Sequence, residues 1–224
     1  MSSALRTLLL GCVIVVAACE RTPPGQQTST AAGGTTTAAA ASDQAPDSFR
    51  VVFETSKGRV VAQAVRRWAP RGVDRFYALV NSGYYDGVKF FRVLPDFMAQ
   101  FGISGDPAVT ARWDHPIADD SVTQSNLRGF ISFATAGPGT RTAQLFINTR
   151  DNVRLDGMGF APIAKVVEGM SVVDGLYMGY GEGAPSGAGP SQDRITNEGN
   201  AYLNRYFPRL DSIITARVVR TTPD

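Results

Sequence analysis

The stretch that decides the fold is residues 90–100, FFRVLPDFMAQ, in which aromatic and aliphatic residues surround a single arginine. Strands are predicted over residues 89–94 and 97–100, because aromatic and β-branched residues favour them. Side chains alternate along a strand, so we expect Phe90, Arg92 and Leu94 on one face. Arg92 is then either an edge residue paired with an acid or a functional cation beside an apolar surface, and the pattern alone leaves both open.

Short strands continue on both sides of this stretch. Residues 49–55 and 59–65 predict a hairpin, and residues 69–82 predict a helix with Pro70 in its first turn. Further strands are predicted at 129–134, 145–149, 163–167 and 211–219, and further helices at 170–177 and 197–207. Many short strands without βαβ alternation indicate a mainly β fold, a closed barrel with capping helices.

Composition excludes several classes of protein. The 22 Lys and Arg nearly balance the 20 Asp and Glu, so a polybasic nucleic-acid binder is not expected. One histidine and two cysteines are too few for a zinc site or an iron–sulfur cluster. All Phe, Tyr and Trp residues lie at or after Phe49, so we expect the folded unit at residues 49–221.

The N-terminus is typical of an export signal. Arg6 precedes an apolar run at residues 8–18, too short to span a bilayer comfortably. The run ends in Val16-Ala17-Ala18-Cys19, which resembles the lipobox of bacterial lipoproteins. We therefore expect a signal peptide at residues 1–18, lipid on Cys19 and a low-complexity tether over residues 19–48. An ordinary signal cut before Cys19 and an uncleaved anchor remain the alternatives.

Residues 90–100 resemble the signature strand of cyclophilins, a family of peptidyl-prolyl cis-trans isomerases. Residues 129–140, 143–149, 155–157 and 164–170 are similar to later segments of that family, in the same order. The resemblance spans residues 49–221. It implies a closed eight-stranded antiparallel barrel capped by two helices, isomerase activity on proline-containing unfolded or extended polypeptides, and no cofactor or metal. We further expect a monomer without a nucleic-acid partner.

The resemblance also implies the site. Arg92 matches the family arginine that donates to the prolyl amide, and Phe97 and Gln100 complete the expected catalytic set. The expected substrate-binding residues are Met98, Ala134, Thr135, Ala136, Gln144, Phe146, Leu155 and Phe160. Apolar and thioether side chains among them suit a prolyl ring.

Two departures and one insertion stand out. Arg154 stands where many cyclophilins carry Trp, which puts binding of cyclosporin-type inhibitors in doubt. Phe160 is nearest to the position of a frequent His on the pocket wall, and its ring can still pack on proline. Thr135, where Asn is frequent, is a mild change. Residues 179–183, GYGEG, superficially resemble a nucleotide loop, but no strand precedes them. We expect a surface insertion over residues 179–210, with a short helix at residues 197–207. We also expect a pocket without histidine, cysteine or carboxylate, and hence turnover that is flat around neutral pH.

The sequence thus predicts an exported, membrane-tethered isomerase on the periplasmic side of a bacterial membrane, with the outer membrane favoured. Its substrates would be X–Pro bonds in exported proteins. A non-catalytic proline-peptide-binding module and an envelope scaffold are the competing hypotheses.

Overall fold

A computed structural model describes residues 44–219. The predicted signal peptide, Cys19 and most of the predicted tether therefore lie outside the described residues. The tether's last residues, 44–48, contact the folded unit: Ala45 is buried, and its N–H donates to the Asp74 carboxylate at 2.9 Å. The first strand begins at Ser48. Packed structure thus begins slightly before Phe49.

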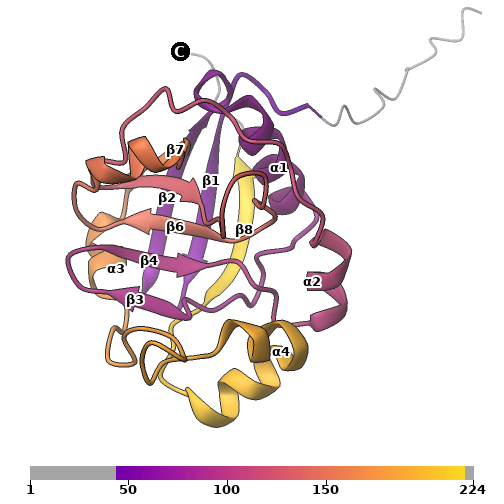
Figure 1. Ribbon diagram of the computed structural model, residues 1–224, viewed down its shortest axis with the longest axis vertical. Coiled ribbons are helices and arrows are strands. Elements are labelled where there is room, and N and C mark those ends of the chain that lie inside the picture. Colours follow the sequence, from indigo (N-terminus) through magenta and orange to yellow (C-terminus); the bar gives the residue numbers. More distant parts are fainter. Residues whose placement is uncertain (1–43, 220–224) are drawn as a thin grey trace, which may run out of the picture. The chain divides into compact units, whose positions relative to one another are not determined.

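Eight strands form one antiparallel sheet (Figure 1). They are β1 Ser48–Thr55, β2 Gly58–Val65, β3 Arg92–Leu94, β4 Met98–Phe101, β5 Phe130–Phe133, β6 Leu145–Asn148, β7 Pro162–Glu168 and β8 Ile213–Val219. Their order is β3-β4-β6-β5-β7-β2-β1-β8. The predicted mainly β, antiparallel, eight-stranded fold is confirmed.

The closure of the predicted barrel is not confirmed. β3 and β8 stand at the two ends of the strand order and do not pair with each other as strands. The segment before β3 approaches β8 through an isolated bridge between Lys89 and Ser212, and the Phe90 N–H donates to the Asp211 carbonyl at 3.0 Å. The Gly87 N–H and the Val88 carbonyl also bond Ile213, so the contact with β8 is made by the segment before β3 and not by β3 itself.

The short β3 also corrects the predicted face. Phe90 packs in the main core, whereas Arg92 and Leu94 lie on the opposite face of the sheet, beside the groove described below. Strict alternation fails because Phe90 precedes the regular strand, which begins only at Arg92. Within β3, Val93 is the residue that packs in the main core.

Within residues 44–219, four α-helices and two 3-10 helices accompany the sheet. They are α1 Pro70–Asn81, α2 Pro107–Trp113, α3 Met170–Asp174, α4 Gln192–Tyr206, η1 Arg66–Trp68 and η2 Val153–Met158. α1 packs against β7 and β8, α3 packs against β2, and α2 packs against α4 (Figure 1). The two predicted capping helices correspond to α1 and α3. α2 was not predicted, and α4 begins five residues before the predicted position 197.

Buried apolar side chains of residues 44–219 form three clusters. The largest lies under the sheet and includes Phe49, Phe76, Tyr85 and Phe101. A second forms beneath α4 around Ile195 and Tyr202. The third is small, consisting of Met98, Phe146 and Leu155, and lies on the other side of β4 and β6. This third cluster forms one wall of the candidate site. Across residues 44–219, no helix has the length and apolarity needed to cross a bilayer.

Candidate active site

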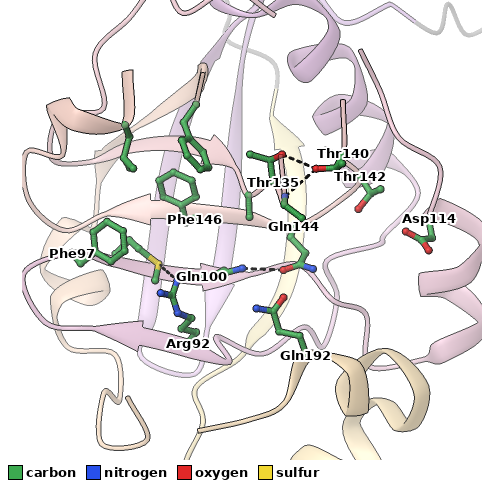
Figure 2. A pocket seen from close by; sticks show the side chains of 15 residues that line it. Arg92, Phe97, Gln100, Asp114, Thr135, Thr140, Thr142, Gln144, Phe146 and Gln192 are labelled. Carbon is green, nitrogen blue, oxygen red and sulfur yellow. Dashed lines mark hydrogen bonds between the residues drawn. The ribbon is translucent and has the colours of Figure 1, made fainter. Parts of the chain in front are cut away.

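All eleven residues predicted to catalyse or bind substrate line one groove with a volume of about 440 Å³ (Figure 2). They are Arg92, Phe97, Met98, Gln100, Ala134, Thr135, Ala136, Gln144, Phe146, Leu155 and Phe160. Asp114, Thr140, Thr142 and Gln192 also line it and were not predicted. Segments far apart in the chain therefore converge as the resemblance implies, while the individual roles stay predictions.

One half of the groove is apolar. Met98, Phe146 and Leu155 form its buried floor, with Phe97 and Phe160 packed against them. The rings of Phe146 and Phe160 meet edge-on, with centroids 5.6 Å apart. Aromatic and thioether surfaces of this kind accept a small apolar ring and leave it little room to turn. This half has the chemistry needed to hold a proline side chain.

Buried asparagines hold the walls of this apolar half in place. The Asn126 side chain donates to the Phe160 carbonyl at 2.8 Å, and the Asn152 side chain donates to the Phe97 carbonyl at 2.8 Å. Asn126 also donates to Asp156, next to Leu155. Burial raises the pKa of Asp156, but hydrogen bonds from Ser125 and Asn126 outweigh that effect and leave it lowered. These contacts fix the pocket walls from behind.

The other half of the groove is polar and is organised around Arg92. Arg92 and Gln100 are directly opposite each other on β3 and β4, and Arg92 Nη1 donates to Gln100 Oε1 at 3.1 Å. Gln100 Nε2 in turn donates to Gln144 Oε1 at 3.0 Å. Figure 2 shows these three side chains in a row along the groove. The register of the sheet thus places a cation and two amides beside the apolar floor.

Arg92 has a further partner that sequence reasoning missed. Arg92 Nε donates to Glu182 Oε1 at 2.6 Å and Nη2 donates to Oε2 at 2.7 Å. Arg92 is therefore paired with an acid and also lines the groove, while its role as a functional cation stays a prediction. The hydrogen bonds from Arg92 lower the pKa of Glu182, against a smaller opposing effect of burial. No sequence signal links two residues 90 positions apart.

The expectation of a site without carboxylates is therefore wrong. Asp114 lines the groove, and Glu182 contacts its arginine. Asp114 belongs to no quoted motif, and Glu182 lies in residues 179–183, for which no functional role was predicted. Within residues 44–219, no three His, Cys, Asp or Glu residues come together as a metal site.

The rim opposite Arg92 offers main-chain groups. Thr135 lies just beyond β5, and its N–H and C=O have no hydrogen-bond partner within the described part of the chain. Its hydroxyl bonds Thr140, whose Oγ1 also accepts the N–H of Ala136 at 2.9 Å (Figure 2). These bonds fix the loop while Thr135 keeps a free donor and acceptor. An extended peptide could pair with both, as a strand does.

Arg154 lies over the ring of Phe97, with its guanidinium carbon 5.0 Å from the ring centroid. The guanidinium carbon of Arg92 lies 5.9 Å from the same centroid. A planar cation thus covers Phe97 where relatives of the implied family frequently carry a tryptophan.

Comparison with known proteins agrees with this geometry. The family model described as cyclophilin-type peptidyl-prolyl cis-trans isomerase matches residues 50–198. A peptidyl-prolyl cis-trans isomerase of Schizosaccharomyces pombe is 38% identical over 129 residues, which cover 54% of this chain and 81% of that protein. Peptidyl-prolyl cis-trans isomerase A of Dickeya dadantii is 38% identical over 136 residues, covering 58% and 72%.

Solved structures show the same fold. A cyclophilin-type peptidyl-prolyl cis-trans isomerase of Cryptosporidium parvum superposes with a TM-score of 0.58 at 19% identity, covering 79% of this chain and 99% of that one. The same protein crystallised in the presence of the dipeptide Ala-Pro gives a TM-score of 0.57. With the family model matching most of the chain and the expected residues gathered in one groove, this chain belongs to the cyclophilin-type peptidyl-prolyl cis-trans isomerases.

Proposed function

We propose that the groove accelerates the cis–trans isomerisation of X–Pro bonds, with the prolyl ring in the apolar half and Arg92 beside the prolyl nitrogen. The observation that carries this proposal is the position of Arg92, a cation in a groove whose adjoining floor is Met98, Phe146 and Leu155. The Ala-Pro dipeptide used with the Cryptosporidium relative supports proline as the recognised residue.

The chemistry demands little beyond such a cation. Rotation about a peptide bond is opposed by a barrier of ~18–20 kcal/mol, because its C–N bond has partial double-bond character. Raising an uncatalysed rate of ~0.01 per second to ~10 per second requires about 4 kcal/mol. When the amide twists, its nitrogen becomes pyramidal and gains a lone pair that accepts a hydrogen bond. A preorganised cationic donor in a partly dry site can supply stabilisation of that size.

Arg92 keeps donors for this task. A guanidinium carries five N–H groups. The bonds to Glu182 use the Nε–H and one Nη2–H, and the bond to Gln100 uses one Nη1–H. The second Nη1–H donates to Met98 Sδ at 3.9 Å, on the floor of the apolar half, and a thioether sulfur is a weak acceptor that a substrate can displace. This is the donor that a prolyl nitrogen above that floor would meet.

The rest of the groove orients the substrate backbone. The free N–H and C=O of Thr135 would pair with residues that precede the proline, and the amides of Gln100 and Gln144 would bond carbonyls nearby. Holding the flanking chain while the X–Pro bond turns confines the motion to one bond.

A direct assay separates an enzyme from a non-catalytic binding module. The full chain, purified in detergent, is mixed with a proline peptide in a protease-coupled isomerisation assay, and binding is measured on the same peptide. An isomerase accelerates the slow phase at substoichiometric concentration. Saturable binding with no acceleration would refute catalysis and favour the binding module.

We also propose that the enzyme acts on exported proteins while anchored through Cys19 to the periplasmic side of a membrane. Support comes from the sequence alone, namely the apolar run and the lipobox-like residues before Cys19. Cells grown with labelled fatty acid should label the wild type and the Cys12→Ser control, but not Cys19→Ser. An unlabelled, soluble wild type would refute the anchor and leave the isomerase proposal intact.

A further inference from the structure

We infer that Glu182 is a positioning residue, which fixes the guanidinium of Arg92 so that turnover depends on the loop at residues 179–190. This inference rests on the proposed isomerase function. It assigns a role to the insertion that the sequence led us to expect only as a surface feature.

The geometry of the pair is the first support. The Glu182 carboxylate accepts two hydrogen bonds from Arg92, one from Nε at 2.6 Å and one from Nη2 at 2.7 Å. The remaining nitrogen, Nη1, is directed to Gln100 and Met98. A bidentate carboxylate fixes both the position and the rotation of a planar guanidinium. Arg92 is therefore held from the insertion on one side and from β4 on the other.

The loop itself is built tightly around Glu182. The Gly189 N–H donates to the Glu182 carbonyl at 2.8 Å, and the Gly183 N–H donates to Glu182 Oε1 at 2.8 Å. A Cβ at Gly187 would lie 2.4 Å from the Glu182 carbonyl oxygen, and one at Gly189 would lie 2.7 Å from it. Only glycine at these two positions allows the main chain to approach the Glu182 carbonyl so closely. The tight turn therefore fixes the main chain of Glu182, from which its carboxylate reaches Arg92.

Both ends of the loop are attached to the domain. The ring of Tyr180 packs edge-on against Phe207, with centroids 5.0 Å apart. At the other end the Ser191 hydroxyl caps α4, and the Ser191 N–H donates to the Tyr202 hydroxyl at 3.2 Å. Figure 1 shows α4 beside the β3 edge of the sheet. The insertion therefore acts as a fixed support and brings Glu182 to Arg92.

Two effects of Glu182 on catalysis oppose each other. Its charge weakens the positive field of Arg92, while its two hydrogen bonds order a side chain that otherwise samples many rotamers. The Glu182 side chain is 38% exposed, whereas the Arg92 side chain is 22% exposed. Water therefore screens the carboxylate charge and reduces its effect on the electrostatic field of Arg92, while the two hydrogen bonds still order the guanidinium. Ordering is therefore the larger effect, and loss of Glu182 should slow the enzyme.

The test compares two glutamates that make the same kind of contact. Glu198 pairs in a two-pronged manner with Arg194 at 2.6 and 2.9 Å, also in the insertion but outside the groove. In the full chain in detergent, Glu182→Ala should lower kcat by about fivefold to tenfold with KM changed less than about twofold. Glu182→Gln keeps an acceptor for Gly183 and should lose less. Glu198→Ala and Glu198→Gln should leave both constants unchanged.

A double substitution shows whether the effect passes through Arg92. If Glu182 acts by positioning, Glu182→Ala should have no further effect in an Arg92→Ala background. Equal or faster turnover in Glu182→Ala would overturn the inference, since faster turnover would mean that the carboxylate restrains the arginine. A full additional loss in the double variant would also overturn it, because the effect would then bypass Arg92.

A second readout does not depend on activity. The Arg92 Nε–H resonance, assigned by its loss in Arg92→Lys, should be protected from exchange in the wild type and in Glu198→Ala, and unprotected in Glu182→Ala, which removes the oxygen that accepts it. A wild type without turnover would refute the proposed function, while this resonance would still decide whether Glu182 holds Arg92. An Nε–H equally protected in Glu182→Ala would overturn the inference.

Discussion

The two halves of the groove are built in different ways. Met98, Phe146 and Leu155 in the apolar half are nearly fully buried, and buried asparagines bond the carbonyls of the neighbouring Phe97 and Phe160. Arg92 in the polar half stands on a three-residue strand at the sheet edge and depends on a carboxylate from a distant loop. The apolar half is thus a buried cluster of the fold, whereas the polar half lies at the sheet edge and is held by a loop. Substitutions in the first should cost stability, and substitutions in the second should cost turnover.

The largest combined effect is expected in the apolar half. Phe146 is 5% exposed, and Phe146→Ala removes a ring from both the floor of the groove and the β6 packing. It should lower the free energy of unfolding by about 3 kcal/mol, measured by chemical denaturation, and raise KM for a proline peptide. Val153→Ala, which changes a residue 57% exposed on η2, is the control and should change neither quantity. Unchanged stability in Phe146→Ala would show that the two halves do not differ in this way.

Asn126 tests the support behind the apolar half. Its side chain is fully buried and bonds Asp156, Ser132 and the Phe160 carbonyl. Asn126→Ala removes the partner of Ser132 and of the Phe160 carbonyl, while Asp156 keeps the bond from the main-chain N–H of residue 126, so the free energy of unfolding should fall by about 1–3 kcal/mol. The exposed Asn197, changed to Ala, provides the control. A wild-type denaturation midpoint for Asn126→Ala would contradict the supporting role.

Gln144 tests the polar half with a smaller effect. It accepts from Gln100 Nε2 and lines the groove while remaining partly exposed. Gln144→Ala should lower kcat/KM by about twofold to threefold and leave the free energy of unfolding within about 0.5 kcal/mol of wild type. A large loss of stability without loss of kcat/KM would reverse the comparison.

The smallest effect is expected from pH. The Arg92 hydrogen bonds lower the pKa of Glu182 from its usual 4.5, so the carboxylate is ionised at neutral pH. Its stabilising contact is fully present above pH 4.5 and is lost as the pH falls through the lowered value. Turnover should be flat from about pH 6 to 8 and decline only in acid, with a weaker acid decline in Glu182→Gln. A bell-shaped profile centred near pH 7 would reveal an acid–base group absent from this account.

The sequence predicted most of the strands, because local runs of β-forming residues specify them. The hairpin of β1 and β2 and the strands β4 to β8 follow from runs of β-forming residues, and all eleven site residues converge as the resemblance implied. The predicted face of Phe90 was wrong because alternation holds only inside a regular strand. α2 was not predicted because its seven residues span too few turns to show a helical repeat.

The missed part of the site is also the part made by contact between distant segments. Glu182 lies in a glycine-rich loop with no helical or strand repeat, and its partner lies 90 residues earlier. Backbone closure at Gly187 and Gly189 places it, and that closure is visible only in three dimensions. The pairing of Arg92 with an acid was foreseeable as a type of contact, but the identity of the acid was not.

The central claim is that Arg92 supplies the stabilisation that turns a proline-binding groove into an isomerase. The most direct measurement is the rate of X–Pro isomerisation at equilibrium, followed by NMR exchange on a proline peptide, for wild type, Arg92→Ala and Arg92→Lys at equal folded concentration. Arg92→Ala should lose at least about tenfold in rate while peptide affinity and unfolding midpoint stay close to wild type, and Lys should restore little because it lacks the planar fork. A folded Arg92→Ala protein with the wild-type rate would contradict the account.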